Sequence, residues 1–146
     1  MEGFVFSGSE IPRDVIQAYL ETHYHVHGSA PTTLKVGEAN PVLAALHQTA
    51  SVACSSFITA WNPVSEQQEL ARDLERQQAL AQTLQQRGLS FIDGIGQHPA
   101  NGWLGEDSFL VLGLALNDAK ALGMQLGQNA IVWSGAEALP RLSLLR

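Results

Sequence analysis

Residues 53–68, ACSSFITAWNPVSEQQ, change from an apolar, β-prone run to a polar run within two residues. The apolar half predicts a strand at the centre of a sheet. The polar half predicts a long helix over 64–87, because proline is favoured in the first turn of a helix and Gly88 is typical of a helix end. Two residues are candidates for the N-cap of this helix: Asn62, or Ser65 in a capping box with a glutamine. Its predicted buried stripe consists of Leu70, Leu74, Ala81 and Leu84.

Three further apolar runs predict the remaining strands of a core sheet. They cover residues 89–96, 109–116 and 129–135, and a helix capped by Asn117 and ended by Gly127 separates the last two. In chain order the core reads strand, helix, strand, strand, helix, strand. That order is typical of the split βαβ arrangement, so we predict an α+β, ferredoxin-like two-layer sandwich.

The N-terminal third of the chain adds to this core. A helix is predicted over 12–22, followed by a β-hairpin over 23–37 and a short helix capped by Asn40. The C-terminal run 139–145 is predicted to pair with the last core strand at an edge. No repeat, low-complexity tract or linker interrupts the chain, so we predict a single domain over residues 1–146.

The predicted topology brings three distant segments to one edge of the sheet. They are the end of the first core strand at Trp61-Asn62, the glycine-rich loop 96–107 and the turn 127–129. The long helix begins at the same edge, and the free N–H groups of a helix N-terminus attract polar and negatively charged ligands. We therefore predict a ligand-binding site formed by Asn62, Ser65, His98, Trp103, Glu106, Gln128 and Asn129.

These candidates also have structural explanations. Asn62 and Ser65 are residues that a helix start requires, and Trp103 is a loop aromatic that can fold back onto the domain. Glu106 and Asp107 are neighbouring carboxylates that could serve as general acid and base or hold a metal, although such pairs are more often solvated. We name no catalytic residue and lean against an enzyme.

Three histidines of the predicted hairpin, His23, His25 and His27, share one face of a strand because strand side chains alternate. Alternating imidazoles can bind zinc, but no neighbouring residue supplies a further ligand, so a polar hairpin face is the favoured interpretation. We predict no metal and no cofactor, and whether these histidines bind a metal stays open. Cys54 has no histidine base beside it and is predicted to be a buried, unreactive thiol.

The composition excludes several classes of partner. The 146 residues are 45% hydrophobic and 15% charged, with a formal net charge of −6 and 8 Lys and Arg residues. Nucleic-acid phosphates require a cluster of basic side chains, and no apolar run approaches the ~18 residues of a membrane span. The N-terminus lacks the features of a signal peptide, and a single cysteine suits a reducing compartment. We predict a soluble, cytoplasmic protein without a nucleic-acid or membrane partner.

Three segments resemble the bacterial domain-of-unknown-function family 3293: FITAWNPVS (57–65), FLVLGL (109–114) and GQNAIVW (127–133). The likeness extends over most of the chain, from the first predicted helix to the last strand. Matched residue by residue, the family's signature falls on Thr59, Ala60, Trp61, Asn62, Pro63, Ser65, Gly127, Gln128 and Asn129. No activity is assigned to the family, so the resemblance implies a bacterial protein of unknown function and no mechanism.

The sequence is compatible with functions from three different classes. The favoured one is a binding module for a small polar or anionic ligand at the sheet edge. The second is an interaction or homodimerisation module, with Trp133 and the run LSLL (142–145) at the interface. The third is a hydrolase that uses a metal or the carboxylates of Glu106 and Asp107.

Overall fold

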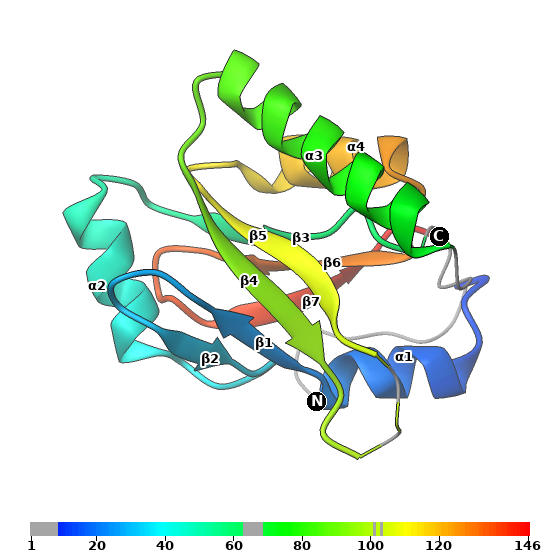
Figure 1. Ribbon diagram of the computed structural model, residues 1–146. Coiled ribbons are helices and arrows are strands. Elements are labelled where there is room, and N and C mark those ends of the chain that lie inside the picture. Colours follow the sequence, from blue (N-terminus) through cyan, green and yellow to red (C-terminus); the bar gives the residue numbers. More distant parts are fainter. Residues whose placement is uncertain (1–8, 63–68, 101, 103) are drawn as a thin grey trace.

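The computed structural model describes residues 9–62, 69–100, 102 and 104–146. Within these ranges the chain forms four helices and a seven-stranded sheet (Figure 1). In chain order the elements are α1 (Arg13–Glu21), β1 (His23–Val26), β2 (Thr32–Leu34), α2 (Pro41–Thr49), β3 (Ser55–Ile58), α3 (Leu70–Gln86), β4 (Phe91–Gln97), β5 (Glu106–Leu112), α4 (Leu116–Gln125), β6 (Ala130–Ser134) and β7 (Pro140–Leu144). No helix of the described ranges is both long and apolar enough to cross a membrane.

The sheet has the strand order β2-β1-β4-β5-β3-β6-β7, and every pair of neighbouring strands is antiparallel. The four central strands are the core strands predicted from the sequence, with α3 between β3 and β4 and α4 between β5 and β6. The predicted hairpin forms one edge as β1 and β2, and the C-terminal run forms the other edge as β7. A mixed α/β fold is therefore confirmed.

Helices cover both faces of the curled sheet (Figure 1). α3 and α4 pack on one face, where Ile58, Leu84 and Leu122 belong to one apolar cluster. α1 and α2 lie against the opposite face, where Ile16 and Leu43 belong to a second cluster. The predicted two-layer arrangement is therefore incomplete, because the N-terminal helices bury their own apolar sides on the second face.

The buried side of α3 differs from the predicted one. Two members of the predicted stripe, Leu70 and Leu74, expose 62% and 42% of their surface. The side chains that α3 buries are Asp73, Gln77, Leu80 and Leu84. The leucine pattern was misleading because the first two turns of the helix direct polar side chains toward the sheet.

Both buried polar side chains of α3 satisfy backbone N–H groups just beyond β3. Asp73 Oδ1 accepts a hydrogen bond of 3.0 Å from the N–H of Asn62. Gln77 Oε1 accepts one of 3.0 Å from the N–H of Ala60. A buried N–H without a partner costs about 1–3 kcal/mol, which explains why polar residues occupy the positions where leucine was expected.

The predicted cap of α2 is confirmed. Asn40 Oδ1 accepts a hydrogen bond of 2.9 Å from the N–H of Leu43, and Asn40 Nδ2 donates to the carbonyl of Thr33 at 3.1 Å. We expect Asn40→Ala to lower the free energy of unfolding by about 1–2 kcal/mol, because the helix cap and the bond to β2 are both lost. Urea denaturation measures the change, and an unaltered midpoint would contradict this role.

The predicted cap of α4 is wrong, because Asn117 lies inside that helix. α4 begins at Leu116 and has no side-chain cap. Asn117→Ala is therefore a matched control for Asn40→Ala, with an expected change within about 0.5 kcal/mol.

The predicted start of the long helix is also wrong, because α3 begins at Leu70, with Glu69 before it and no side-chain cap, and the side chain of Asn62 donates to Glu106 instead. Pro63 and Ser65 lie outside the described residues.

Candidate functional site

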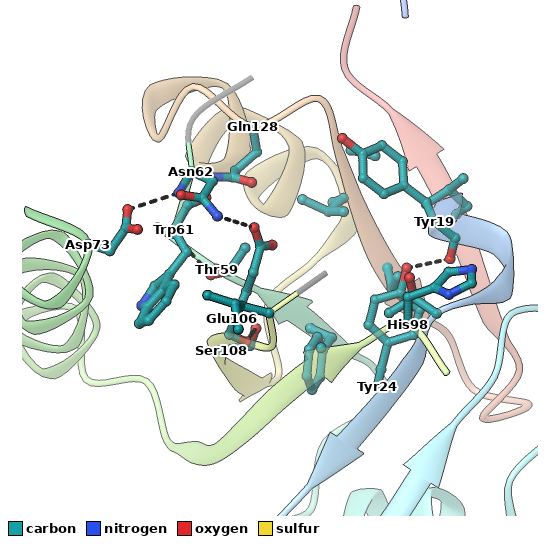
Figure 2. Close-up of a pocket in the computed structure, with 18 of the residues that line it drawn as sticks. Tyr19, Tyr24, Thr59, Trp61, Asn62, Asp73, His98, Glu106, Ser108 and Gln128 are labelled. Carbon is teal, nitrogen blue, oxygen red and sulfur yellow. Dashed lines mark hydrogen bonds between the residues drawn. The ribbon is translucent and has the colours of Figure 1, made fainter. Parts of the chain in front are cut away.

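A large cavity opens at the end of the sheet where β3 ends and β5 begins (Figure 2). Its volume is about 550 Å³, which is within the range of small-molecule sites in proteins. Side chains and backbone from α1, α3 and every strand except β2 line it. Segments that are far apart in the sequence therefore form one wall, as predicted for the end of β3, the loop after β4 and the turn before β6.

The floor of the cavity is apolar. It consists of residues from the cluster beneath α1 and α2, among them Tyr24, Phe57, Val132 and Leu142. The rings of Tyr24 and Phe57 meet edge to face, with 5.3 Å between their centroids. The hydroxyl of Tyr24 donates to the carbonyl of Tyr19 at 2.6 Å, and burial raises the pKa of Tyr24 well above its ordinary value. Tyr24 is therefore a neutral, fixed part of the floor.

The rim on the opposite side is polar and hydrogen-bonded (Figure 2). Asn62 Nδ2 donates to Glu106 Oε2 at 2.8 Å, while the N–H of Asn62 donates to Asp73. Gln128 Nε2 donates to the carbonyl of Trp61 at 3.0 Å. Asn62 thus joins the end of β3 to both α3 and β5, and Gln128 joins it to the turn before β6.

Asn62 has an unusual backbone conformation. Its φ of +44° lies in the left-handed region, which asparagine tolerates better than most residues other than glycine. Such conformations persist where surrounding contacts hold them, and they concentrate at functional sites. Here the two hydrogen bonds to Asp73 and Glu106 hold the residue at the mouth of the cavity.

Glu106 is the most perturbed carboxyl group of the rim. Its pKa is raised from 4.5 to about 7, chiefly by burial; the hydrogen bond from Asn62 lowers it, and the negative charge of Asp73 raises it further. The described residues of the lining include no lysine or arginine that could stabilise the carboxylate. At neutral pH Glu106 is therefore divided between a hydrogen-bond donor form and an acceptor form.

His98 is held at the α1 side of the cavity. Its Nδ1 accepts a hydrogen bond of 3.0 Å from the N–H of Ala100, so its Nε2 carries the proton and donates to Glu21 Oε1 at 2.9 Å. The hydrogen bond from His98, with a second from Gln17, lowers the pKa of Glu21. These two hydrogen bonds hold the imidazole in a fixed orientation in the cavity wall.

The structure brings together four of the predicted site residues, Asn62, His98, Glu106 and Gln128, as lining residues of this cavity. Asn129 does not line it. Asn129 Nδ2 instead donates to the hydroxyl of Tyr19 at 3.1 Å, and Tyr19 does line the cavity. Ser65 and Trp103 lie outside the described residues. The binding role of these residues stays a prediction.

Asp73 and Tyr24 line the cavity but were not predicted as site residues. Asp73 lies on the same face of α3 as Gln77 and Leu84. Its helical spacing from Leu84 could have indicated a buried carboxylate. Tyr24 alternates with the histidines of β1 and faces the core, where its side chain exposes 8% of its surface. The alternation that placed the three histidines on one face of the strand therefore also placed Tyr24 on the opposite, buried face.

Glu106 and Asp107 do not form a working pair. Both belong to β5, and successive side chains of a strand point to opposite faces. Glu106 lines the large cavity, whereas Asp107 borders a second cavity of about 380 Å³ beside α3. The acid–base or metal role considered for this pair therefore lacks the geometry that it needs.

The histidine hairpin shows no metal-binding arrangement within the described residues. His25 Nδ1 lies 2.8 Å from the hydroxyl of Thr33, and burial, with the nearby His23 and His27, lowers the pKa of His25. No group of three or more His, Cys, Asp or Glu side chains in the described part of the chain could hold a metal ion. Cys54 is half-buried and its thiol donates to the carbonyl of Leu114 at 3.4 Å.

Fold and cavity together define a mixed α/β domain with an acidic rim and an apolar floor at one end of its sheet. Residues 58–131 match the family described as "Protein of unknown function (DUF3293)", and because the match covers half of the chain, the chain belongs to this family. The match is shorter than the likeness seen in the sequence, since it excludes α1 and the histidine hairpin. No curated protein and no solved structure matches the chain.

Proposed function

We propose that this protein binds a small organic molecule, which has an apolar body and a hydrogen-bonding polar group, in the cavity at the end of the sheet. The observation that carries the proposal is the division of one cavity of about 550 Å³ into an apolar floor and a polar rim. Sites for small molecules combine a mainly apolar lining with a few well-placed polar groups. The apolar body would lie on Tyr24 and Phe57, and the polar group would face Asn62 and Glu106.

The electrostatics of the rim favour one part of the ligand class predicted from the sequence. Asp73 and Glu106 place negative charge beside the cavity, and Asp73 raises the pKa of Glu106. An anionic ligand would add like charge to a partly buried site, which is costly. We therefore retain the polar ligand and no longer favour the anionic one.

Gly96 offers a direct way to fill the cavity. A Cβ at this position would meet Tyr24 and Thr22 at 3.8 and 3.9 Å, which is ordinary van der Waals contact. Gly96→Leu should therefore fold and should place its side chain in the cavity that Gly96 lines. Asp93→Leu is the matched control, because it adds the same side chain to β4 at an exposed position that does not line this cavity.

We expect Gly96→Leu to weaken the binding of small probes at least about tenfold, while Asp93→Leu binds as the wild type does. The probes are 2-phenylethanol, phenethylamine and phenylacetate, which share an aromatic body and differ in their polar group. Ligands of this size reach dissociation constants of about 1–10 mM, so saturation-transfer NMR is the suitable measurement. If no probe binds the wild type, or if Gly96→Leu binds all of them equally well, the proposal is wrong.

The two other functions predicted from the sequence receive less support. Trp133, predicted at a dimer interface, is only half-exposed, and its indole N–H donates to the carbonyl of Leu114 at 3.0 Å. The carboxylates of the hydrolase alternative lie on opposite faces of β5. Homodimerisation is tested by light scattering at micromolar concentration, where a strict monomer would exclude it.

We also propose a ferredoxin-like architecture for the central unit from β3 to β6. The sheet order β4-β5-β3-β6, its antiparallel pairing and the position of α3 and α4 on one face support this assignment. A cytoplasmic location and a bacterial origin stay predictions from the sequence.

A further inference from the structure

We propose that the occupant of the cavity is an organic cation, with an ammonium or amidinium group at Glu106 and an apolar body over the aromatic floor. This inference rests on the proposed function and specifies the class of ligand. It is carried by the charge of the rim, the open hydrogen-bonding capacity of Glu106 and the aromatic lining.

The charges around Glu106 are negative or neutral on every side described. The negative charge of Asp73 of α3 raises the pKa of Glu106, and Tyr24 of β1, whose own pKa is raised by burial and by the charge of Glu106, keeps its proton. Across the cavity, the ring N–H of His98 is already directed to Glu21. None of the residues outside the described ranges is a lysine or an arginine. A positive charge is thus the element that this rim lacks.

Glu106 also has room for further donors. Among the described residues its carboxylate accepts one hydrogen bond, from Asn62 Nδ2 to Oε2, whereas a carboxylate can accept about four. An ammonium group offers three N–H donors and an amidinium group offers four, both with a charge that favours the ionised carboxylate. The donors of the ligand would occupy positions on the carboxylate that the described residues leave open.

The aromatic lining fits the rest of such a ligand. Tyr19, Tyr24, Phe57 and Trp61 all line the cavity. Aromatic ring faces attract cations by about 0.5–2 kcal/mol, most strongly where water is excluded.

The matched pair phenethylamine and 2-phenylethanol tests the inference, because the two differ only in the charged group. We expect phenethylamine to bind the wild type at least about tenfold more tightly than 2-phenylethanol at pH 8. At pH 6 Glu106 is mostly protonated, so phenethylamine should bind about tenfold more weakly than at pH 8, while 2-phenylethanol should show no such change. Titration by NMR at both pH values measures the four dissociation constants.

Two variants connect the effect to Glu106. Glu106→Gln should remove both the preference for the amine and its pH dependence. Glu75→Gln removes the same charge from an exposed position of α3 and should retain both. If both probes bind the wild type equally at pH 8, the cation inference is wrong but the proposed function stands. If neither of these probes binds, the cation inference is wrong, and if phenylacetate does not bind either, the proposed function is wrong as well.

Discussion

Glu106→Gln is expected to raise the free energy of unfolding by about 2 kcal/mol at pH 8. Burial, with the nearby charge of Asp73, raises the pKa of Glu106 to about 7, so at pH 8 the folded protein holds a carboxylate in surroundings that disfavour it. Glutamine keeps the length of the side chain and an oxygen that can accept from Asn62, but it carries no charge. A pKa difference of one corresponds to about 1.4 kcal/mol, and the partial exposure of Glu106 reduces the total gain.

The stability gain should depend on pH in one direction. Glu106 has a reference pKa of 4.5 and a folded-state pKa of about 7. Between these values the unfolded chain releases a proton that the folded chain keeps, so wild-type stability falls as the pH rises through this window. The difference between Glu106→Gln and wild type should therefore be small at pH 4, grow up to about pH 7 and stay constant above it. Urea denaturation across this range measures it.

Asp107→Asn is the matched control for this prediction. It neutralises the neighbouring carboxylate of β5, which is exposed and points to the other face, and it should change the stability by less than about 0.5 kcal/mol at either pH. A Glu106→Gln protein that is no more stable than wild type at pH 8 would contradict the account of a buried carboxylate without a cationic partner. A stable variant that has lost the amine preference would show that stability is sacrificed for binding at this position.

Asp73→Ala is expected to lower the free energy of unfolding by about 2–3 kcal/mol. The side chain of Asp73 exposes only 2% of its surface, and its Oδ1 accepts the hydrogen bond from the N–H of Asn62. Alanine would leave this N–H without its acceptor and would remove a contact that holds the left-handed conformation of Asn62. Probe binding should be lost as well, because Asn62 positions the rim.

Asp73→Asn separates the hydrogen bond from the charge. Asparagine retains an acceptor oxygen at the same distance along the side chain, so we expect a loss below about 1 kcal/mol. Chemical denaturation of both variants at pH 7 gives the comparison. Equal losses in Asp73→Ala and Asp73→Asn would mean that the charge, and not the hydrogen bond to Asn62, accounts for the role of Asp73.

Local patterns were sufficient for the order of the elements and for several of their ends. Alternation and helical spacing depend on side chains within a few residues of one another, so the core strands, α1 and the β1–β2 hairpin could be predicted. The cap at Asn40 and the glycine at position 127, whose φ is +71°, are local as well. The proximity of Asn62 and Gln128 was predicted from the expected strand topology.

Local patterns failed where two faces of one element compete for the core. The leucines of α3 indicated one buried side, but the N–H groups of Ala60 and Asn62 required the polar side chains of the adjacent positions instead. Glu106 and Asp107 are neighbouring carboxylates in the sequence, but their side chains point to opposite faces of β5 and line different cavities.

The properties of the cavity depended on the tertiary structure alone. The volume of the cavity and the raised pKa of Glu106 depend on residues that are distant in the sequence. Asn62, for example, forms hydrogen bonds with Glu106 and Asp73, which lie 44 and 11 positions away from it along the chain. Burial and electrostatic interaction depend on distance through space, which no local pattern contains. The sequence therefore supplied the elements and most of the candidate residues, while the fold decided which of them share a cavity and in which protonation state.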